Sequence, residues 1–172
     1  MAIIDIGAEA INRNASTSEG FTYIDRTNPA NESGVIDTIE IWAYAVLVNC
    51  IVGTFYKTNG FTLKCRDSVF IGDVARWSKQ TFNGLSIAVE AGDYIGFYAT
   101  SGRVERSDTG YDGTYRLLGE HIDPGDEAVY GLVDDDAISL HGIGGEAPPP
   151  AAVTPWNLAP RMAMMIGSFL LR

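Results

Sequence analysis

Apolar and polar side chains alternate along much of the chain with a period of two residues. In residues 35–42, Ile39 and Ile41 point to one side, while Glu40 and Trp42 point to the other. Successive side chains of a β-strand face opposite sides of its sheet, so this pattern predicts a strand that is buried on one face only.

The same alternation recurs in residues 94–99. Here Ile95 and Phe97 share one face, and Tyr94 and Tyr98 share the other. This segment also predicts a strand, with its two tyrosines on the face that is turned away from the core.

The turn Lys57-Thr58-Asn59-Gly60, with Asn59-Gly60 at its tip, predicts a hairpin between residues 46–56 and residues 61–65. Asn-Gly is the strongest short signal for a two-residue hairpin turn, because both positions need a positive φ. The pairs expected from this turn are Tyr56 with Phe61, Thr54 with Leu63, and Val52 with Cys65.

The chain has two cysteines, Cys50 and Cys65, one on each side of this turn. In the expected register they are diagonal neighbours on one face of the hairpin. Two cysteines do not make a disulfide scaffold, and we expect two free, buried and inert thiols. A stabilising bridge between them is the alternative.

Strand signals follow one another at intervals of about ten residues, separated by Gly, Asn or Asp, as in β-sandwiches. A second hairpin is expected at residues 112–113 (Asp-Gly), between Val104 and Leu118. The best helical candidate, residues 73–80, is long enough for little more than one turn. We therefore expect residues 1–145 to form an all-β domain, an antiparallel β-sandwich with a jelly-roll-like arrangement.

The last part of the chain has a different character. Residues 142–160 are rich in Gly, Pro and Ala and contain Pro148–Pro150, which favours an extended linker over residues 146–160. Residues 161–172 are strongly apolar, and we expect them to form a strand that docks on their own sandwich or on a neighbouring subunit. The residues expected to make this assembly contact are Met162, Met164, Ile166, Phe169 and Leu171.

The net charge and the lack of several motifs argue against three classes of function: nucleic-acid binding, membrane spanning and catalysis. Lys and Arg total 12 against 22 Asp and Glu, a formal net charge of −10, so a nucleic-acid partner would be repelled. No apolar run is long enough to span a membrane, and no secretory signal is recognisable at the start. The chain also lacks G-x-S-x-G, H-E-x-x-H and Walker A motifs, and we expect no enzymatic activity.

Two weaker chemical candidates remain. Calcium prefers six to eight oxygen ligands, which acidic loops can supply. A structural calcium ion is therefore a candidate, although no other cofactor is expected; its proposed ligands are Asp123, Asp126, Asp134 and Asp136. Exposed aromatic rings can stack on sugars or on partner proteins. The candidate ligand-binding rings are Trp42, Tyr44, Tyr94 and Tyr98.

Residues 92–98 (GDYIGFY) and 28–34 (NPANESG) resemble stretches of uncharacterised β-sandwich proteins. Such proteins occur among phage and other viral structural proteins and among extracellular lectin-like modules. The resemblance covers residues 1–145. It implies a jelly-roll-like sandwich with a structural or adhesive role, and it assigns no site residue.

Two hypotheses follow for the function. The first is a structural protein that assembles with itself, such as a virion decoration, tail or fibre subunit, located in a virion or an extracellular assembly. Its partners would be further copies of the chain and other virion proteins. The second is a carbohydrate-binding, lectin-like module, with glycans as ligands and calcium as a potential aid.

Overall fold

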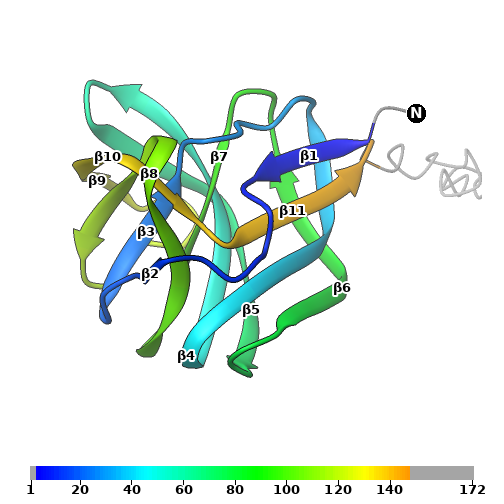
Figure 1. Ribbon diagram of the computed structural model, residues 1–172. Coiled ribbons are helices and arrows are strands. Elements are labelled where there is room, and N and C mark those ends of the chain that lie inside the picture. Colours follow the sequence, from blue (N-terminus) through cyan, green and yellow to red (C-terminus); the bar gives the residue numbers. More distant parts are fainter. Residues whose placement is uncertain (1–2, 148–172) are drawn as a thin grey trace, which may run out of the picture.

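The computed structural model describes residues 3–147, and this part consists mostly of strands (Figure 1). Every pairing between the strands is antiparallel, which confirms the predicted all-β antiparallel fold. The strands are β1 (Ile4–Gly7), β2 (Ala15–Ser16), β3 (Phe21–Asp25), β4 (Gly34–Asn59), β5 (Thr62–Val74), β6 (Lys79–Val89), β7 (Tyr94–Tyr98), β8 (Ser101–Leu118), β9 (Glu127–Val129), β10 (Gly131–Ile138) and β11 (Leu140–Gly145).

The helical candidate at residues 73–80 is wrong. This segment ends β5, passes through a short connection and begins β6. Its backbone is held by β4, since Val74 pairs with Leu47 and the N–H of Trp77 donates to the carbonyl of Ala43 at 2.9 Å. Pairing with β4 therefore overrides any local tendency to form a helical turn.

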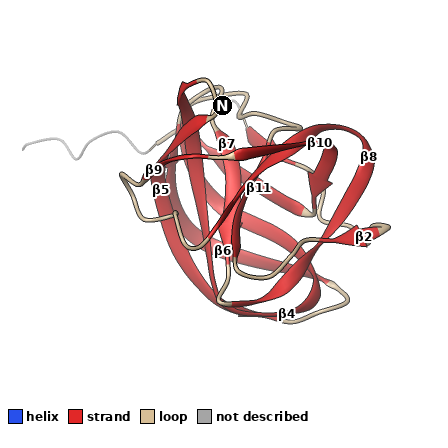
Figure 2. Cartoon of the chain, turned by 90° about the vertical axis from the view of Figure 1, so that its left-hand side faces the viewer, coloured by secondary structure: helices blue, strands red, loops and turns tan. Residues whose placement is uncertain are grey.

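The 26-residue strand β4 organises the fold because different parts of it pair with different strands. Residues 34–42 lie between β11 and β6, and residues 43–48 contact β8. Residues 47–59 pair with β5, and residues 51–55 among them also pair with β7. We call the set β1, β11, the first part of β4, and β6 layer 1. Layer 2 contains, in spatial order, β9, β5, the last part of β4, β7, β3, β8 and β10. The strong curvature of β4 and β8 is visible in Figure 2.

One apolar core takes side chains from both layers. Ile39 and Ile41 of layer 1 are fully buried, as are Val52 and Ile95 of layer 2. Thr38, Glu40 and Trp42 point the other way and are only half-buried, which confirms the alternation read from the sequence. Two layers around one core are compatible with a β-sandwich.

A second apolar cluster covers the opposite face of layer 2. It contains Phe55, Cys65 and Tyr115, and it is closed by Ile122 from the connection between β8 and β9. The carbonyl of Ile122 lies 3.2 Å from the Cys65 sulfur. Both faces of layer 2 are therefore buried over this region, whereas the outer face of layer 1 carries polar side chains.

The expected register of the β4–β5 hairpin is wrong. Asn59 pairs with Thr62, so the turn is formed by Gly60 and Phe61 and not by Asn59 and Gly60. As a result Cys65 lies opposite Phe55.

This register also separates the two cysteines. Cys50 lies opposite Gly72 and belongs to the central core, while Cys65 belongs to the second cluster. Both thiols are free and buried, as expected, but they are not neighbours on one face. Burial, and then the nearby Asp126, raises the pKa of the Cys65 thiol to about 12.

The hairpin expected at residues 112–113 is also wrong, because β8 continues without a break from Ser101 to Leu118. Gly113 has a φ of +99° and faces a register shift in β10, where Asp135 has a φ of +64°. A Cβ at position 113 would lie 2.6 Å from the carbonyl oxygen of Val133. The glycine therefore serves a β-bulge with a close backbone approach, and not a turn.

Candidate functional site

A shallow hollow lies at the end of layer 1 where the described chain ends. It measures about 270 Å³ and is lined by Val35, Asp37, Leu85, Ser86, Gly145 and Glu146. Val35 pairs with Gly145 of β11 on one side and with Ala88 of β6 on the other. The ends of β11 and β6 thus flank the start of β4, and the hollow lies between them. Its volume is below the usual range for small-molecule sites, and it suits a side chain better than a whole ligand.

One edge of β6 lacks a hydrogen-bonded partner strand along most of its length, although β5 runs alongside it and leads into it through residues 75–78. β6 pairs with β4, and no other strand within residues 3–147 pairs with it. The edge is closed only near its end, where the N–H of Ala88 donates to Asp67 Oδ2 and its carbonyl accepts from Thr54 Oγ1, each at 2.7 Å. Residues 79–86 have no such closure among the described residues.

Apolar side chains lie beside this open edge. Phe82 and Leu85 of β6 and Val69 and Ile71 of β5 pack against the core but are only partly buried. β6 also bulges here, because its pairing jumps from Asn83 to Ile87 while β4 advances by only two residues. The edge therefore offers both unpaired backbone and incompletely covered apolar surface.

The opposite edge of layer 1 is closed. The connection between β3 and β4 lies along β1, where Gly7 N–H donates to the carbonyl of Asn28 at 2.8 Å. The Asn31 side chain accepts from Asp5 N–H at 2.8 Å and donates to the carbonyl of Ile3 at 2.9 Å. Hydrogen bonds from the connection between β3 and β4 therefore cover the β1 edge, whereas at the β6 edge the bonds described reach only Ala88.

A polar row crosses the outer face of layer 1 and takes one side chain from each of its four strands. His141 Nε2 lies 2.8 Å from Asp5 Oδ1, and Lys79 Nζ lies 2.9 Å from Glu40 Oε1. His141 Nδ1 is 3.9 Å from Glu40. Such exposed pairs contribute little stability, but they keep this face solvated. Both ring nitrogens of His141 therefore face carboxylates of the sheet surface.

The structure does not bring the four candidate aromatic rings together. Trp42 is half-buried beside the polar row of layer 1, and Tyr44 follows it with 47% exposure. Tyr94 and Tyr98 pack against the second apolar cluster of layer 2, where the Tyr94 ring meets Tyr115 edge-on with centroids 6.2 Å apart. The alternation placed these two tyrosines correctly on the side away from the core, but a loop covers that side.

Trp77 is an exposed ring that the sequence did not single out. It lies between β5 and β6, is 65% exposed and has a φ of +69°. The guanidinium of Arg76 lies over its ring, 3.9 Å from the centroid. A bulky side chain rarely adopts a positive φ, and such outliers often occur at functional surfaces. A single tryptophan in a turn has no periodicity, so pattern analysis could not find it.

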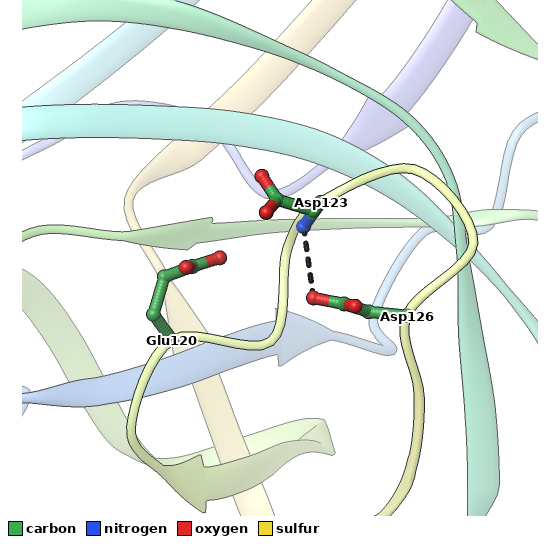
Figure 3. Close-up of side chains that lie close together, drawn as sticks. All are labelled: Glu120, Asp123 and Asp126. Carbon is green, nitrogen blue, oxygen red and sulfur yellow. Dashed lines mark hydrogen bonds between the residues drawn. The ribbon is translucent and has the colours of Figure 1, made fainter.

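Two of the four predicted metal ligands, Asp123 and Asp126, lie close together, and Glu120, which was not predicted as a ligand, lies beside them. Glu120, Asp123 and Asp126 each place a carboxylate oxygen within 4.8 Å of the others (Figure 3). Asp126 Oδ2 accepts from the N–H of Asp123 at 3.1 Å, and Glu120 Oε1 accepts from the N–H of Ile122 at 3.1 Å. All three come from the connection between β8 and β9. Their oxygens are of the kind that calcium prefers.

Asp134 and Asp136 lie elsewhere, on β10, and not in the loop that their sequence predicted. Asp136 is 2% exposed and forms an ion pair with Arg106. Burial raises the pKa of Asp136 even though Arg106 opposes this shift. Asp134 is exposed, and neither it nor Asp136 belongs to the group that Glu120, Asp123 and Asp126 form.

Asp25 is a buried carboxylate that contributes to the interior and not to a surface site. Its oxygens accept from the N–H groups of Thr27 at 2.7 Å and Ile138 at 2.8 Å. Burial nevertheless raises the pKa of Asp25 to about 6, because desolvation outweighs these two hydrogen bonds.

The predicted assembly residues lie outside the described part of the chain. These are Met162, Met164, Ile166, Phe169 and Leu171, together with most of the linker at residues 146–160. Residues 3–147 contain no helix with the length and apolarity that crossing a membrane requires.

No protein-family model matches this chain, and no curated protein matches its sequence. The resemblance to viral structural and lectin-like sandwiches therefore stays a prediction.

Proposed function

We propose that this chain is a non-catalytic structural protein that assembles with copies of itself. Under this proposal the chain is a virion decoration, tail or fibre subunit, and residues 161–172 form part of the contact between copies. The observation that carries the proposal is the edge of β6 that no strand within residues 3–147 pairs with, next to the hollow where the described chain ends.

Open edges are a liability that folded proteins usually remove. Unpaired N–H and C=O groups in a row can pair with any strand that approaches them, and partly exposed apolar groups increase this tendency. One edge of layer 1 is closed by Asn28 and Asn31, whereas at the other edge, beside Phe82 and Leu85, no strand within residues 3–147 pairs with β6. An edge that is open in a protein able to close edges is best explained as a place for pairing.

The C-terminal residues supply a suitable partner. Residues 161–172 contain seven side chains from Met, Ile, Phe and Leu, and their burial would stabilise a contact by about 1.5 kcal/mol or more for each side chain fully covered. Extended peptides commonly add a strand to an exposed sheet edge, with backbone hydrogen bonds giving affinity and side-chain pockets giving specificity.

The test is the mass of the assembly in solution. Light scattering after size exclusion should give a multiple of 18.6 kDa for the full chain and a lower multiple for the full-length variants Ile166→Asp and Phe169→Asp. Ser168→Asp, a polar-to-charged change in the same segment, is the matched control and should retain the assembly. An unchanged mass in both aspartate variants, with a normal circular-dichroism spectrum, would contradict a role for this segment.

A second candidate is glycan binding, and the exposed Trp77 ring favours it. Arg76 covers one side of this ring, and the strand that carries Tyr44 runs beside it through the Trp77–Ala43 hydrogen bond. Aromatic rings presented in this way can stack on sugar planes. The proposal includes calcium as an aid, held at Glu120, Asp123 and Asp126.

A glycan array with and without chelator tests this candidate. Binding that is lost in Trp77→Ala but kept in Phe70→Ala, an equally exposed ring with 62% exposure, would support it. Silence on all glycans in both conditions would remove it, and binding that the chelator does not change would remove only the calcium part.

A further inference from the structure

We infer that Asn83 is a site of spontaneous modification, where the backbone nitrogen of Gly84 attacks the Asn83 side chain and converts it to aspartate and isoaspartate. The reaction needs water as its only co-reactant. It depends on residues of β4 and β6 alone, so it holds whether or not the chain assembles as proposed above.

The chain contains two Asn-Gly pairs, at residues 59–60 and 83–84. Glycine has no Cβ, so its backbone turns more readily than that of any other residue and its nitrogen is the least shielded. A five-membered ring between an asparagine side chain and the next backbone nitrogen therefore closes with the least steric resistance at Asn-Gly. The two pairs have the same local chemistry, and their surroundings decide which of them reacts.

The reaction consists of a ring closure and a hydrolysis. The Gly84 nitrogen forms a bond to Cγ of Asn83 and gives up its proton, while the bond from Cγ to Nδ2 breaks and the side-chain nitrogen leaves with that proton as ammonia. Water then opens the cyclic imide. Cleavage between the ring nitrogen and Cγ gives aspartate, and cleavage between the ring nitrogen and the backbone carbonyl carbon gives isoaspartate.

The backbone at Gly84 lies in the bulge of β6. Asn83 pairs with Thr38, and the next residue of β6 that pairs with β4 is Ile87. Gly84 has a φ of +72°, and a Cβ built on it would meet no atom within 4 Å apart from its chain neighbours. A bulge leaves its extra residues unpaired, so the peptide between Asn83 and Gly84 can turn with fewer ladder bonds to break than in a regular strand.

The Asn83 side chain is exposed and weakly held. Its hydrogen bond within residues 3–147 is a long one, 3.3 Å between its Oδ1 and Thr38 Oγ1. The Thr38 hydroxyl also donates to Asp37 Oδ1, at 2.7 Å. A hydroxyl has one proton to donate, and the shorter bond to a carboxylate is the stronger of the two. The Asn83 amide is therefore able to turn toward the Gly84 nitrogen.

Asn59 is exposed too, but its backbone is held more firmly. It pairs with Thr62 and closes the two-residue turn of Gly60 and Phe61. Ring closure at Asn59 would require this turn to open. We therefore expect the pair at residues 83–84 to react faster than the pair at residues 59–60.

The products change the chemistry of one end of layer 1. A carboxylate at position 83 would lie within about 6 Å of Asp37, since both contact the same Thr38 hydroxyl. Asp37 and Glu146 already line the hollow, so the new charge adds to a group of like charges. Isoaspartate also inserts one carbon atom into the backbone of β6, which shifts the strand beyond it relative to β4.

Peptide mapping of the full-length protein by mass spectrometry tests the inference. The folded protein, checked by circular dichroism, and the same protein in urea are incubated in parallel at mildly alkaline pH. The rates at which aspartate and isoaspartate form at Asn83 and Asn59 are then compared. Each folded rate divided by its unfolded rate gives the protection of that site, and local opening sets this protection. Protection at Asn83 should be lower than at Asn59 by roughly fivefold or more. Equal protection at the two sites, or stronger protection at Asn83, would overturn the inference.

Asn83→Gln is the matched control. Glutamine keeps the amide, but it would have to close a six-membered ring, which forms much more slowly. Isoelectric focusing of the folded native chain should show acidic species that accumulate with time, and these should form several-fold more slowly in Asn83→Gln. Acidic species that accumulate equally fast in both proteins would show that another residue reacts, and would overturn the assignment to Asn83.

Discussion

The two edges of layer 1 have similar backbone chemistry, but they differ in how far hydrogen bonds cover them. At β1, the connection between β3 and β4 covers the edge, and its residues Asn28 and Asn31 form hydrogen bonds with the backbone there. At β6, closure is limited to Ala88, and residues 79–86 have no partner strand in the described part of the chain. The difference shows that the fold has the means to close an edge and that the β6 edge is not closed by the same means. The proposed assembly follows from this contrast.

The largest expected effect on stability comes from the buried Asp25, which lies at neither edge of layer 1. It should be measured first, so that it can be separated from the effects of edge variants. The pKa of Asp25 is about 6 in the folded state against 3.8 in an unfolded chain, so the folded state holds more protons between these pH values. Folding stability therefore falls as pH rises from about 4 to above 6, by about 3 kcal/mol at most. Urea unfolding at pH 4.5 and 7.5 should show this fall for the native chain and a smaller one for Asp25→Asn. Equal pH slopes in the two proteins would contradict the assignment, and edge variants are best compared at one fixed pH.

The next effect concerns the one closed point on the β6 edge. Asp67 accepts from Ala88 N–H through one oxygen and from Ser68 N–H, at 2.9 Å, through the other. Asp67→Ala removes both charge-assisted bonds, and we expect a loss of about 2–3 kcal/mol in the free energy of unfolding. Asp134→Ala, an exposed aspartate on β10, is the control and should change stability little. A loss no larger than that of the control would mean that the bond between β5 and β6 does not hold this end of the layers together.

The sequence predicted the strands better than their pairing. Alternation located the buried faces at Ile39 and Ile41 correctly, because a period of two is a local property. The hairpin register failed because the turn uses Gly60-Phe61, one residue beyond the favoured Asn-Gly, and because bulges shift the pairing further along β4. Such bulges depend on how two strands fit together, and a single segment does not encode them visibly.

The candidate sites were harder to predict for the same reason. Tyr94 and Tyr98 lie away from the core as predicted, but the connection that carries Ile122 covers that face, and this contact joins segments far apart in sequence. Glu120 joins Asp123 and Asp126 only because the loop folds back on itself. The open edge of β6 is a property of the whole strand order, so no local pattern could reveal it.

The smallest effect gives the sharpest comparison of the two edges, because it uses the same substitution on each. Asn31→Ala removes the side-chain bonds to Asp5 and Ile3 at the β1 edge, and we expect a loss of about 1–2 kcal/mol, measured by urea unfolding. Asn83→Ala on β6 removes only one long contact, 3.3 Å from Thr38 Oγ1, and should cost less than about 0.5 kcal/mol. Hydrogen exchange should then be faster at β1 in the first variant and unchanged at β1 in the second. Equal losses at the two positions would show that the edges are closed to the same extent, and the contrast between them would disappear.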